Sequence, residues 1–187
     1  MTSLDPQISE LNLLLSHNIG DDVARCTILA RRLRRFLRPD WLPPEAKIGG
    51  NDCYQRHLIY EDSDGRFCVG SFVWKPETPI HDHACWGVFG VVRGCLSSDN
   101  FILDAQGELH QVSTDTVMAG CAAWLSPACG DIHRIANRAK RTTALSLHVY
   151  GARFAEVCRT RYDNVSQVSI PFSPPVAASL PNTPIVG

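Results

Sequence analysis

Residues 71–94 read SFVWKPETPIHDHACWGVFGVVRG, and this stretch decides the fold class. Two runs rich in valine, phenylalanine, tryptophan and glycine lie on either side of a connection that contains two prolines. β-Branched and aromatic residues favour strands, and proline interrupts them. In the middle, His81 and His83 are one residue apart, so on an extended chain their imidazoles project from one face and Asp82 from the other. The stretch therefore predicts strands that bring two histidines to one side of a sheet.

The same pattern continues through the rest of the chain after Gly50. β-Favouring runs separated by Gly, Pro, Asp and Asn occur at residues 66–74, 86–94, 100–104, 110–114 and 142–150. Many short strands with turns between them are typical of a sandwich or barrel. The sequence therefore predicts a mostly β fold.

The first forty residues instead show helical spacing. Apolar residues recur at intervals of three and four between residues 3 and 37, and Gly20, followed by Asp21 and Asp22, separates two expected helices. A linker rich in proline and glycine follows at residues 39–50. We expect one domain over residues 1–187, with a helical segment at 1–40, a barrel at 50–170 and a proline-rich strap or tail at 171–187.

Charge and composition restrict the function. The chain has 18 basic and 19 acidic residues, a net charge of -1, so we expect no attraction to nucleic acid or to an anionic membrane. The first residues show no signal-peptide pattern, and no apolar run is long enough to span a bilayer. The cysteines include no CxxC pair, which fits free thiols in a reducing compartment. We therefore expect a cytoplasmic monomer or small homo-oligomer that acts on small molecules.

The histidine pair resembles the first sequence motif of the cupin superfamily. In that motif HxH is followed by a glutamate and then by a glycine, and here the segment reads HDH-ACW-G-VFGVVR-G. His81, His83 and Gly94 match, whereas Gly87 occupies the position of the glutamate ligand. The second cupin motif is matched, with one extra residue in its turn, by Gly120, Pro127, Gly130, His133 and Asn137. The resemblance implies a double-stranded β-helix barrel in which His133 is the third metal ligand.

Three histidines without a carboxylate would leave the charge of a divalent metal uncompensated, so such a site favours anionic substrate groups. One face of an octahedral metal would also stay open, as in the two-histidine, one-carboxylate sites of non-heme iron enzymes. Zinc and nickel would fit the same ligands. The simpler alternative is that the three histidines are only packed or exposed side chains.

A second constellation lies in the run SLHVY. Ser146, His148 and Tyr150 alternate along it, so on a strand their side chains share a face and could form a hydrogen-bonded relay. An ordinary strand with its polar residues outward would give the same pattern. A hydrolytic Ser–His pair is disfavoured, because the chain has no GxSxG elbow.

The segments HDH, GDIH and SLHVY occur in the order found in the cysteine dioxygenase family of thiol dioxygenases, which the chain resembles from about Tyr54 to Tyr150. The resemblance implies one ferrous iron (Fe2+) with the ligands His81, His83 and His133. Tyr150, positioned by His148 and Ser146, would hydrogen-bond to oxygen or substrate near the iron. The implied reaction adds both atoms of O2 to the sulfur of a small thiol and belongs to sulfur metabolism.

Some members of that family link the tyrosine covalently to a cysteine. Gly87 takes the place of that cysteine here, so we expect no cross-link. Cys85 is close in sequence but out of alignment, and we interpret it as a loop or core thiol.

The implied substrate is a thiol carboxylate, which arginine can bind with two hydrogen bonds. Arg56 is the first candidate, because YQRHL resembles the Tyr-x-Arg segment with which cysteine dioxygenases bind the substrate, and Tyr54 would share its strand face. This favours L-cysteine, oxidised to cysteine sulfinate. The segment HDHACWG instead resembles enzymes for 3-mercaptopropionate, and Arg159 could add a contact for a dicarboxylic thiol such as mercaptosuccinate.

Simpler interpretations of these residues stay open. Arg56 could form a surface ion pair, and Arg159 could be a solvated side chain. A cupin that binds a metal as a sensor, without turnover, is the alternative function, because cupins serve both purposes.

Overall fold

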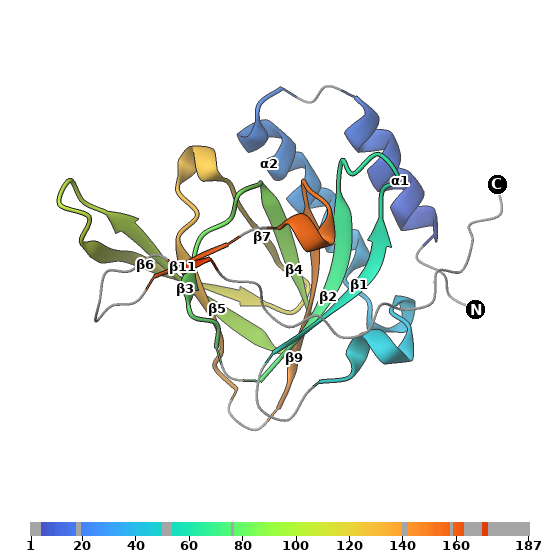
Figure 1. Ribbon diagram of the computed structural model, residues 1–187. Helices are drawn as coiled ribbons and strands as arrows, with labels where there is room; N and C mark the ends of the chain where they lie inside the picture. The colour runs from blue at the N-terminus through green and yellow to red at the C-terminus, as the bar shows by residue number, and fades with distance from the viewer. Residues whose placement is uncertain are drawn as a thin grey trace.

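The computed structural model describes residues 5–17, 20–49, 54–75, 77–139, 142–157, 159–162 and 170–171. In this part of the chain, two helices precede two antiparallel β-sheets that face each other (Figure 1). The expected mostly β, double-stranded β-helix fold with two N-terminal helices is thus confirmed. Of the expected C-terminal strap or tail, everything after Pro171 lies outside the described residues.

The first sheet has the strand order β1, β2, β9, β4, β7. Its strands are β1 (Gln55–Glu61), β2 (Cys68–Trp74), β4 (Gly87–Arg93), β7 (Ala122–Leu125) and β9 (Ala144–Tyr150). β9 lies in the middle, antiparallel to β2 and β4, and every residue in it is buried. The helices cover one face of this sheet and the second sheet the other, so β9 is buried on both faces: Leu145 and Leu147 pack towards the helices, and Tyr150 towards the second sheet.

The two helices begin and end where the sequence indicates. α1 (Asp5–Ser16) and α2 (Asp22–Leu33) flank Gly20, and Asp21 caps α2 by accepting a hydrogen bond from the Ala24 amide at 2.9 Å. The buried face of α2 packs on β4 and β7. The chain after α2 forms short 3-10 helices: η1 (Arg34–Phe36), η2 (Pro39–Trp41) and η3 (Pro44–Lys47).

The second sheet has the order β11, β10, β3, β8, β5, β6. Its strands are β3 (Ile80–His81), β5 (Cys95–Leu103), β6 (Leu109–Met118), β8 (His133–Asn137), β10 (Thr160–Tyr162) and β11 (Ile170–Pro171). β5 and β6 form a hairpin that extends beyond the rest of the sheet (Figure 1). The predicted runs at 100–104 and 110–114 fall at the turn end of these two longer strands.

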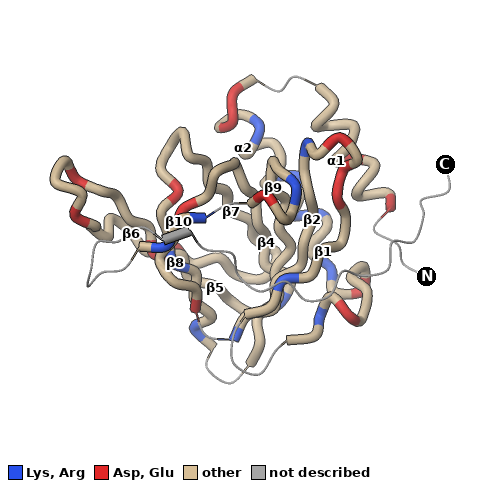
Figure 2. Tube along the Cα trace, in the orientation of Figure 1, with Lys and Arg blue, Asp and Glu red and all other residues tan. Residues whose placement is uncertain are grey.

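Charged residues of both signs are interspersed along the chain (Figure 2). On α2, for example, Asp22 and Arg25 form an ion pair one turn apart. Among the described residues no helix is long and apolar enough to cross a membrane.

Candidate metal centre

Three histidines converge between the two sheets. His81 in β3 lies opposite His133, the first residue of β8. His83 lies beyond the end of β3, so the prediction that one strand carries both His81 and His83 is wrong. The ring centroids are 4.8–5.1 Å apart, and one potential ligand nitrogen from each histidine lies within 4.8 Å of the others. All three side chains are buried. The group could therefore hold one metal ion.

The imidazoles are in the form that binds metals. Nδ1 of His81 donates to the carbonyl oxygen of Pro79 at 2.9 Å, which leaves Nε2 as the ligand atom. Burial lowers the pKa of His81 to about 3, and the Arg159 cation adds to this effect. Burial also holds the pKa values of His83 and His133 well below the usual range. Neutral, buried nitrogen donors fit a divalent metal, because none must lose a proton before binding it.

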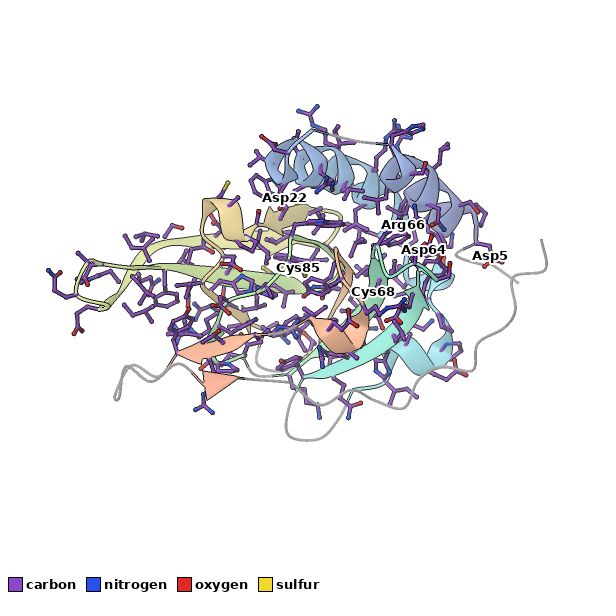
Figure 3. The ribbon with its side chains drawn as sticks, turned by 45° about the horizontal axis from the view of Figure 1, so that its top comes forward. Asp5, Asp22, Asp64, Arg66, Cys68 and Cys85 are labelled. Atoms are coloured by element: carbon purple, nitrogen blue, oxygen red, sulfur yellow. The ribbon has the colours of Figure 1, made fainter. Side chains whose placement is uncertain are left out.

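Gly87 explains why no carboxylate completes this ligand set. A Cβ atom at this position of β4 would lie 2.8 Å from Cε1 and 2.9 Å from Cδ1 of Tyr150, closer than packed carbons approach. The ring of Tyr150 therefore takes the space that a glutamate would need. Cys85, two residues before Gly87, is a free and partly buried thiol whose pKa burial raises to about 11. It packs against the hydrophobic cluster that contains Tyr150 and Cys68; the two cysteines are labelled in Figure 3.

Ser146, His148 and Tyr150 form a continuous hydrogen-bonded chain along β9. Ser146 Oγ lies 2.7 Å from Nε2 of His148, and Nδ1 of His148 lies 3.0 Å from the Tyr150 hydroxyl. The indole N–H of Trp74 donates to Ser146 Oγ at 2.6 Å. All three relay side chains are buried, so the alternative with polar residues directed outward is wrong. The structure brings together the three side chains that the alternation along SLHVY predicts.

The two hydrogen bonds of this relay can run in either direction, depending on which nitrogen of His148 carries the proton. Burial lowers the pKa of His148 far below its usual range and raises that of Tyr150, so both groups are uncharged near neutral pH. Either Ser146 donates to Nε2 and Nδ1 donates to Tyr150, or both hydrogen bonds run in the opposite direction. In the first arrangement, the Tyr150 hydroxyl keeps its own proton for a ligand in the cavity. In the second, the hydroxyl donates that proton to His148.

Two phenylalanines hold the His148 ring in place. Its centroid lies 3.9 Å from that of Phe72 and 5.4 Å from that of Phe89, with the planes 17° and 15° from parallel. Phe72 comes from β2 and Phe89 from β4, the two neighbours of β9. The stacking keeps water from the imidazole and fixes its orientation towards Tyr150.

Arg159 reaches the cavity just before β10. It is 4 % exposed, and its Nη2 lies 3.4 Å from the Tyr150 hydroxyl, with the guanidinium carbon 5.5 Å from the centre of the Tyr150 ring. The interpretation of Arg159 as a solvated side chain is therefore wrong. An arginine that touches the end of the relay and lines the cavity can receive an anion there.

Arg56 and Tyr54 lie near each other but differ in their access to the cavity. Tyr54 lines it and stacks on Trp74, with ring centroids 5.1 Å apart. Arg56 in β1 is buried, so it is not a surface ion pair, but its guanidinium packs over the Phe154 ring at 5.0 Å and does not line the cavity. Burial and the neighbouring Arg159 lower the pKa of Arg56 to about 10. Arg56 therefore contributes positive charge from behind the cavity wall.

Asp82, between the two histidines of HDH, binds β10. Its carboxylate accepts hydrogen bonds from the Thr160 amide at 2.6 Å and from the Tyr162 hydroxyl at 2.8 Å. Its own amide donates to the Thr160 carbonyl oxygen at 3.1 Å. These bonds hold the strand that follows Arg159 against β3. From the sequence, Asp82 is expected only to point away from the histidines; its position between two candidate ligands was the signal for this contact with β10.

The histidines, the relay and Arg159 surround one small cavity. It is lined by Tyr54, Phe72, Trp74, Thr78, His81, His83, Gly87, Val88, Phe89, Leu125, His133, Ile135, His148, Tyr150 and Arg159. No acidic residue occurs among these described lining residues. The free volume is about 10 Å³, and a groove of about 300 Å³ adjoins it, with Phe89, Leu125 and His133 lining both. A substrate would therefore need some of the lining side chains to move.

Several solved proteins are similar to part of this chain. No protein-family model matches the chain. Similar solved structures include an uncharacterized conserved protein with a double-stranded β-helix domain from Klebsiella pneumoniae, at 16% identity over 63% of this chain and 85% of that one, with a TM-score of 0.49. A cupin superfamily protein from Desulfitobacterium hafniense has 10% identity over 62% of this chain and 93% of that one, with a TM-score of 0.45. Oxalate oxidase in complex with glycolate has 18% identity over 56% of each chain, so this chain spans little more than half of that enzyme, with a TM-score of 0.44.

Proposed function

We propose that this protein is a non-heme iron(II) thiol dioxygenase, which converts the thiol of a small thiol carboxylate to a sulfinate. The observation that carries the proposal is the meeting of the three histidines, the Ser146–His148–Tyr150 relay and Arg159 at one buried cavity. Three histidines alone would serve any metal-binding cupin. The relay supplies a hydrogen-bonding hydroxyl and Arg159 an anion-binding guanidinium beside them, and the relay also occurs in the family that the sequence resembles.

The metal would be held by His81, His83 and His133, whose neutral imidazoles suit it. Bound ferrous iron would supply the redox chemistry that joins O2 to sulfur. Both oxygen atoms end on the sulfur, and the sulfur supplies the electrons that reduce them. No external reductant is needed, and the thiol proton is released or retained by the sulfinic acid.

Tyr150 would hold a proton next to the reacting atoms. Its raised pKa keeps the phenol protonated, and the relay through His148 lets the hydroxyl donate into the cavity or accept from it. Trp74 and Ser146 fix the far end of the relay, so the hydroxyl position is set by hydrogen bonds along a rigid central strand.

Arg159 would receive the carboxylate of the substrate. Its guanidinium is buried and lines the cavity, where a charge-assisted pair is stronger than in water. Binding of the carboxylate there would place the thiol between Arg159 and the histidines, which orients sulfur for reaction.

The charge of the cavity favours a thiol with two carboxylates as the second candidate beside L-cysteine. Arg159 lines the cavity, Arg56 lies behind it, and no described lining residue is acidic. The ammonium group of L-cysteine would find no acidic partner in such a field, whereas mercaptosuccinate would place one carboxylate on Arg159 and its second carboxylate in the positive field to which Arg56 contributes. 3-Mercaptopropionate, with one carboxylate and no ammonium, lies between the two.

Oxygen uptake by the iron-loaded protein tests the proposal. We expect uptake with at least one of mercaptosuccinate, 3-mercaptopropionate and L-cysteine, and none with the metal-free protein. A protein that binds iron and these thiols but consumes no oxygen would be a sensor rather than an enzyme. Turnover that persists in the metal-free protein would overturn the proposed mechanism.

A further inference from the structure

The three histidines differ in what holds their second nitrogen. Nδ1 of His81 is bonded to the Pro79 carbonyl oxygen, and Nδ1 of His133 lies 3.5 Å from the Ser98 hydroxyl. Nδ1 of His83 is buried and has no hydrogen-bond partner within the described residues. A buried polar nitrogen without a partner is costly, so its nearest polar neighbour is worth identifying.

That neighbour is the carboxylate of Asp131. Oδ2 of Asp131 accepts a hydrogen bond from the backbone amide of His83 at 2.7 Å and lies 3.9 Å from His83 Nδ1. The two side chains are only 1 % and 9 % exposed. Gly130, with φ of 86°, turns the chain immediately before Asp131. This turn places the Asp131 carboxylate next to the HDH segment.

A small movement would complete the contact. A hydrogen bond between Nδ1 and Oδ2 needs a separation of about 2.9 Å, roughly 1 Å shorter than the present distance. A metal that draws Nε2 of His83 would fix the proton on Nδ1, and the ring could then turn towards the carboxylate. Ligand histidines in metal sites commonly donate their second N–H to such an acceptor.

Asp82, the other acid next to these histidines, is engaged elsewhere. Both of its oxygens accept hydrogen bonds from β10, at Thr160 and Tyr162. Asp131 is thus the carboxylate that the described part of the chain directs at a ligand histidine.

We propose that Asp131 is a positioning residue of the metal centre. It orients His83 and provides, from outside the ligand set, the negative charge that the three histidines lack. Gly87 removes the carboxylate from the ligand set itself, and Asp131 compensates through His83. The inference rests on the metal site of the proposed function and is independent of its thiol chemistry.

Metal titrations of full-length protein test this role. Metal-free wild type, Asp131→Asn and Asp82→Asn would be titrated with Co2+, followed by visible absorption, and with Fe2+ without oxygen against a chromophoric chelator. Asparagine retains an oxygen for the His83 amide, so Asp131→Asn removes the charge and leaves the backbone contact. We expect Asp131→Asn to raise the Kd for both metals about 10–100-fold, and Asp82→Asn to leave it near the wild-type value.

Thermal unfolding of the metal-free variants separates positioning from a structural role. We expect Asp131→Asn to unfold at the wild-type temperature while its metal affinity falls and its Co2+ spectrum shifts. An unchanged Kd in Asp131→Asn would overturn the inference. An equal loss of affinity in Asp82→Asn, or a loss that only follows a lower unfolding temperature, would overturn it as well.

Discussion

Tyr150 and Arg159 reach the same cavity from strands that are held in different ways. Tyr150 ends β9, the central strand of its sheet, which pairs along its length with β2 and β4 and is buried throughout. Arg159 precedes β10, a strand of three residues whose partners within the described part of the chain are the two short strands β3 and β11. Tyr150, the proposed proton-holding group, therefore lies in the buried centre of the fold, whereas Arg159, the proposed anion-binding group, depends on a few contacts at one side.

This contrast separates two kinds of sensitivity. A substitution in the relay disturbs buried hydrogen bonds in the best-packed strand, so it should affect both stability and the chemical step. A substitution around β10 should change how the substrate is held, with little effect on folding, because few core side chains come from that segment.

Loss of the metal site is the largest expected effect and is common to both regions. His133→Ala removes one of three ligand nitrogens, so bound iron and oxygen uptake should both fall to background. Metal analysis and an oxygen electrode on the same sample measure this. An iron content and a rate equal to those of wild type would exclude the three-histidine site.

Arg159→Gln is expected to have the next largest effect, and it tests the peripheral side of the comparison. A hydrogen bond to a charged group contributes about 1.5–3 kcal/mol, so KM for thiol carboxylates should rise roughly 10–100-fold. The matched control is Arg56→Gln, whose guanidinium lies outside the cavity lining. Arg56→Gln should raise KM for mercaptosuccinate more than KM for 3-mercaptopropionate. If Arg56→Gln instead raises KM more than Arg159→Gln does with every thiol, Arg56 is the main carboxylate ligand, as the sequence first indicated.

Ser146→Ala tests the central side. It leaves the Trp74 indole N–H and one nitrogen of His148 without their buried partner. The free energy of unfolding should fall by about 1–3 kcal/mol, and kcat should fall about tenfold, which corresponds to 1.4 kcal/mol, while KM stays near the wild-type value. Chemical denaturation and steady-state kinetics measure the two effects. A change confined to KM would contradict the assignment of the relay to the chemical step.

Tyr162→Phe should have the smallest effect and affect only β10. It removes the hydroxyl that donates to Asp82 but leaves the Thr160 amide bonded. One hydrogen bond contributes about 0.5–1.5 kcal/mol, so KM should rise roughly 2–10-fold with kcat and the unfolding temperature nearly unchanged. Wild-type KM in this variant would show that Asp82 does not position Arg159.

The same contrast explains what the sequence could predict. The common face of Ser146, His148 and Tyr150 follows from alternation along an extended segment, which is a local property. His81 and His83 were identified by their spacing in HDH, although His83 lies beyond the end of β3. The burial of Arg159 could not be predicted, because it depends on pairing between β10 and β3, which are far apart in the chain. Asp131 was missed for a similar reason, since its contact with His83 joins two distant turns.

The fold itself was predictable in its type but less so in its boundaries. Apolar runs identified the buried strands of the first sheet, where both faces are covered. β6 has mostly exposed residues, so its sequence lacks the alternation that would have indicated its full length. The 3-10 helices η2 and η3 were expected only as a linker, because short turns that begin with proline carry no periodicity.

Turnover under labelled oxygen, 18O2, tests the central claim most directly. Iron-loaded wild-type protein would be supplied with mercaptosuccinate, 3-mercaptopropionate or L-cysteine, and the product mass would be measured. Because both oxygen atoms should be transferred to sulfur, we expect a sulfinate that carries two labelled atoms, and no sulfinate from His133→Ala. A disulfide as the only product, or a sulfinate with an oxygen atom from water, would contradict it.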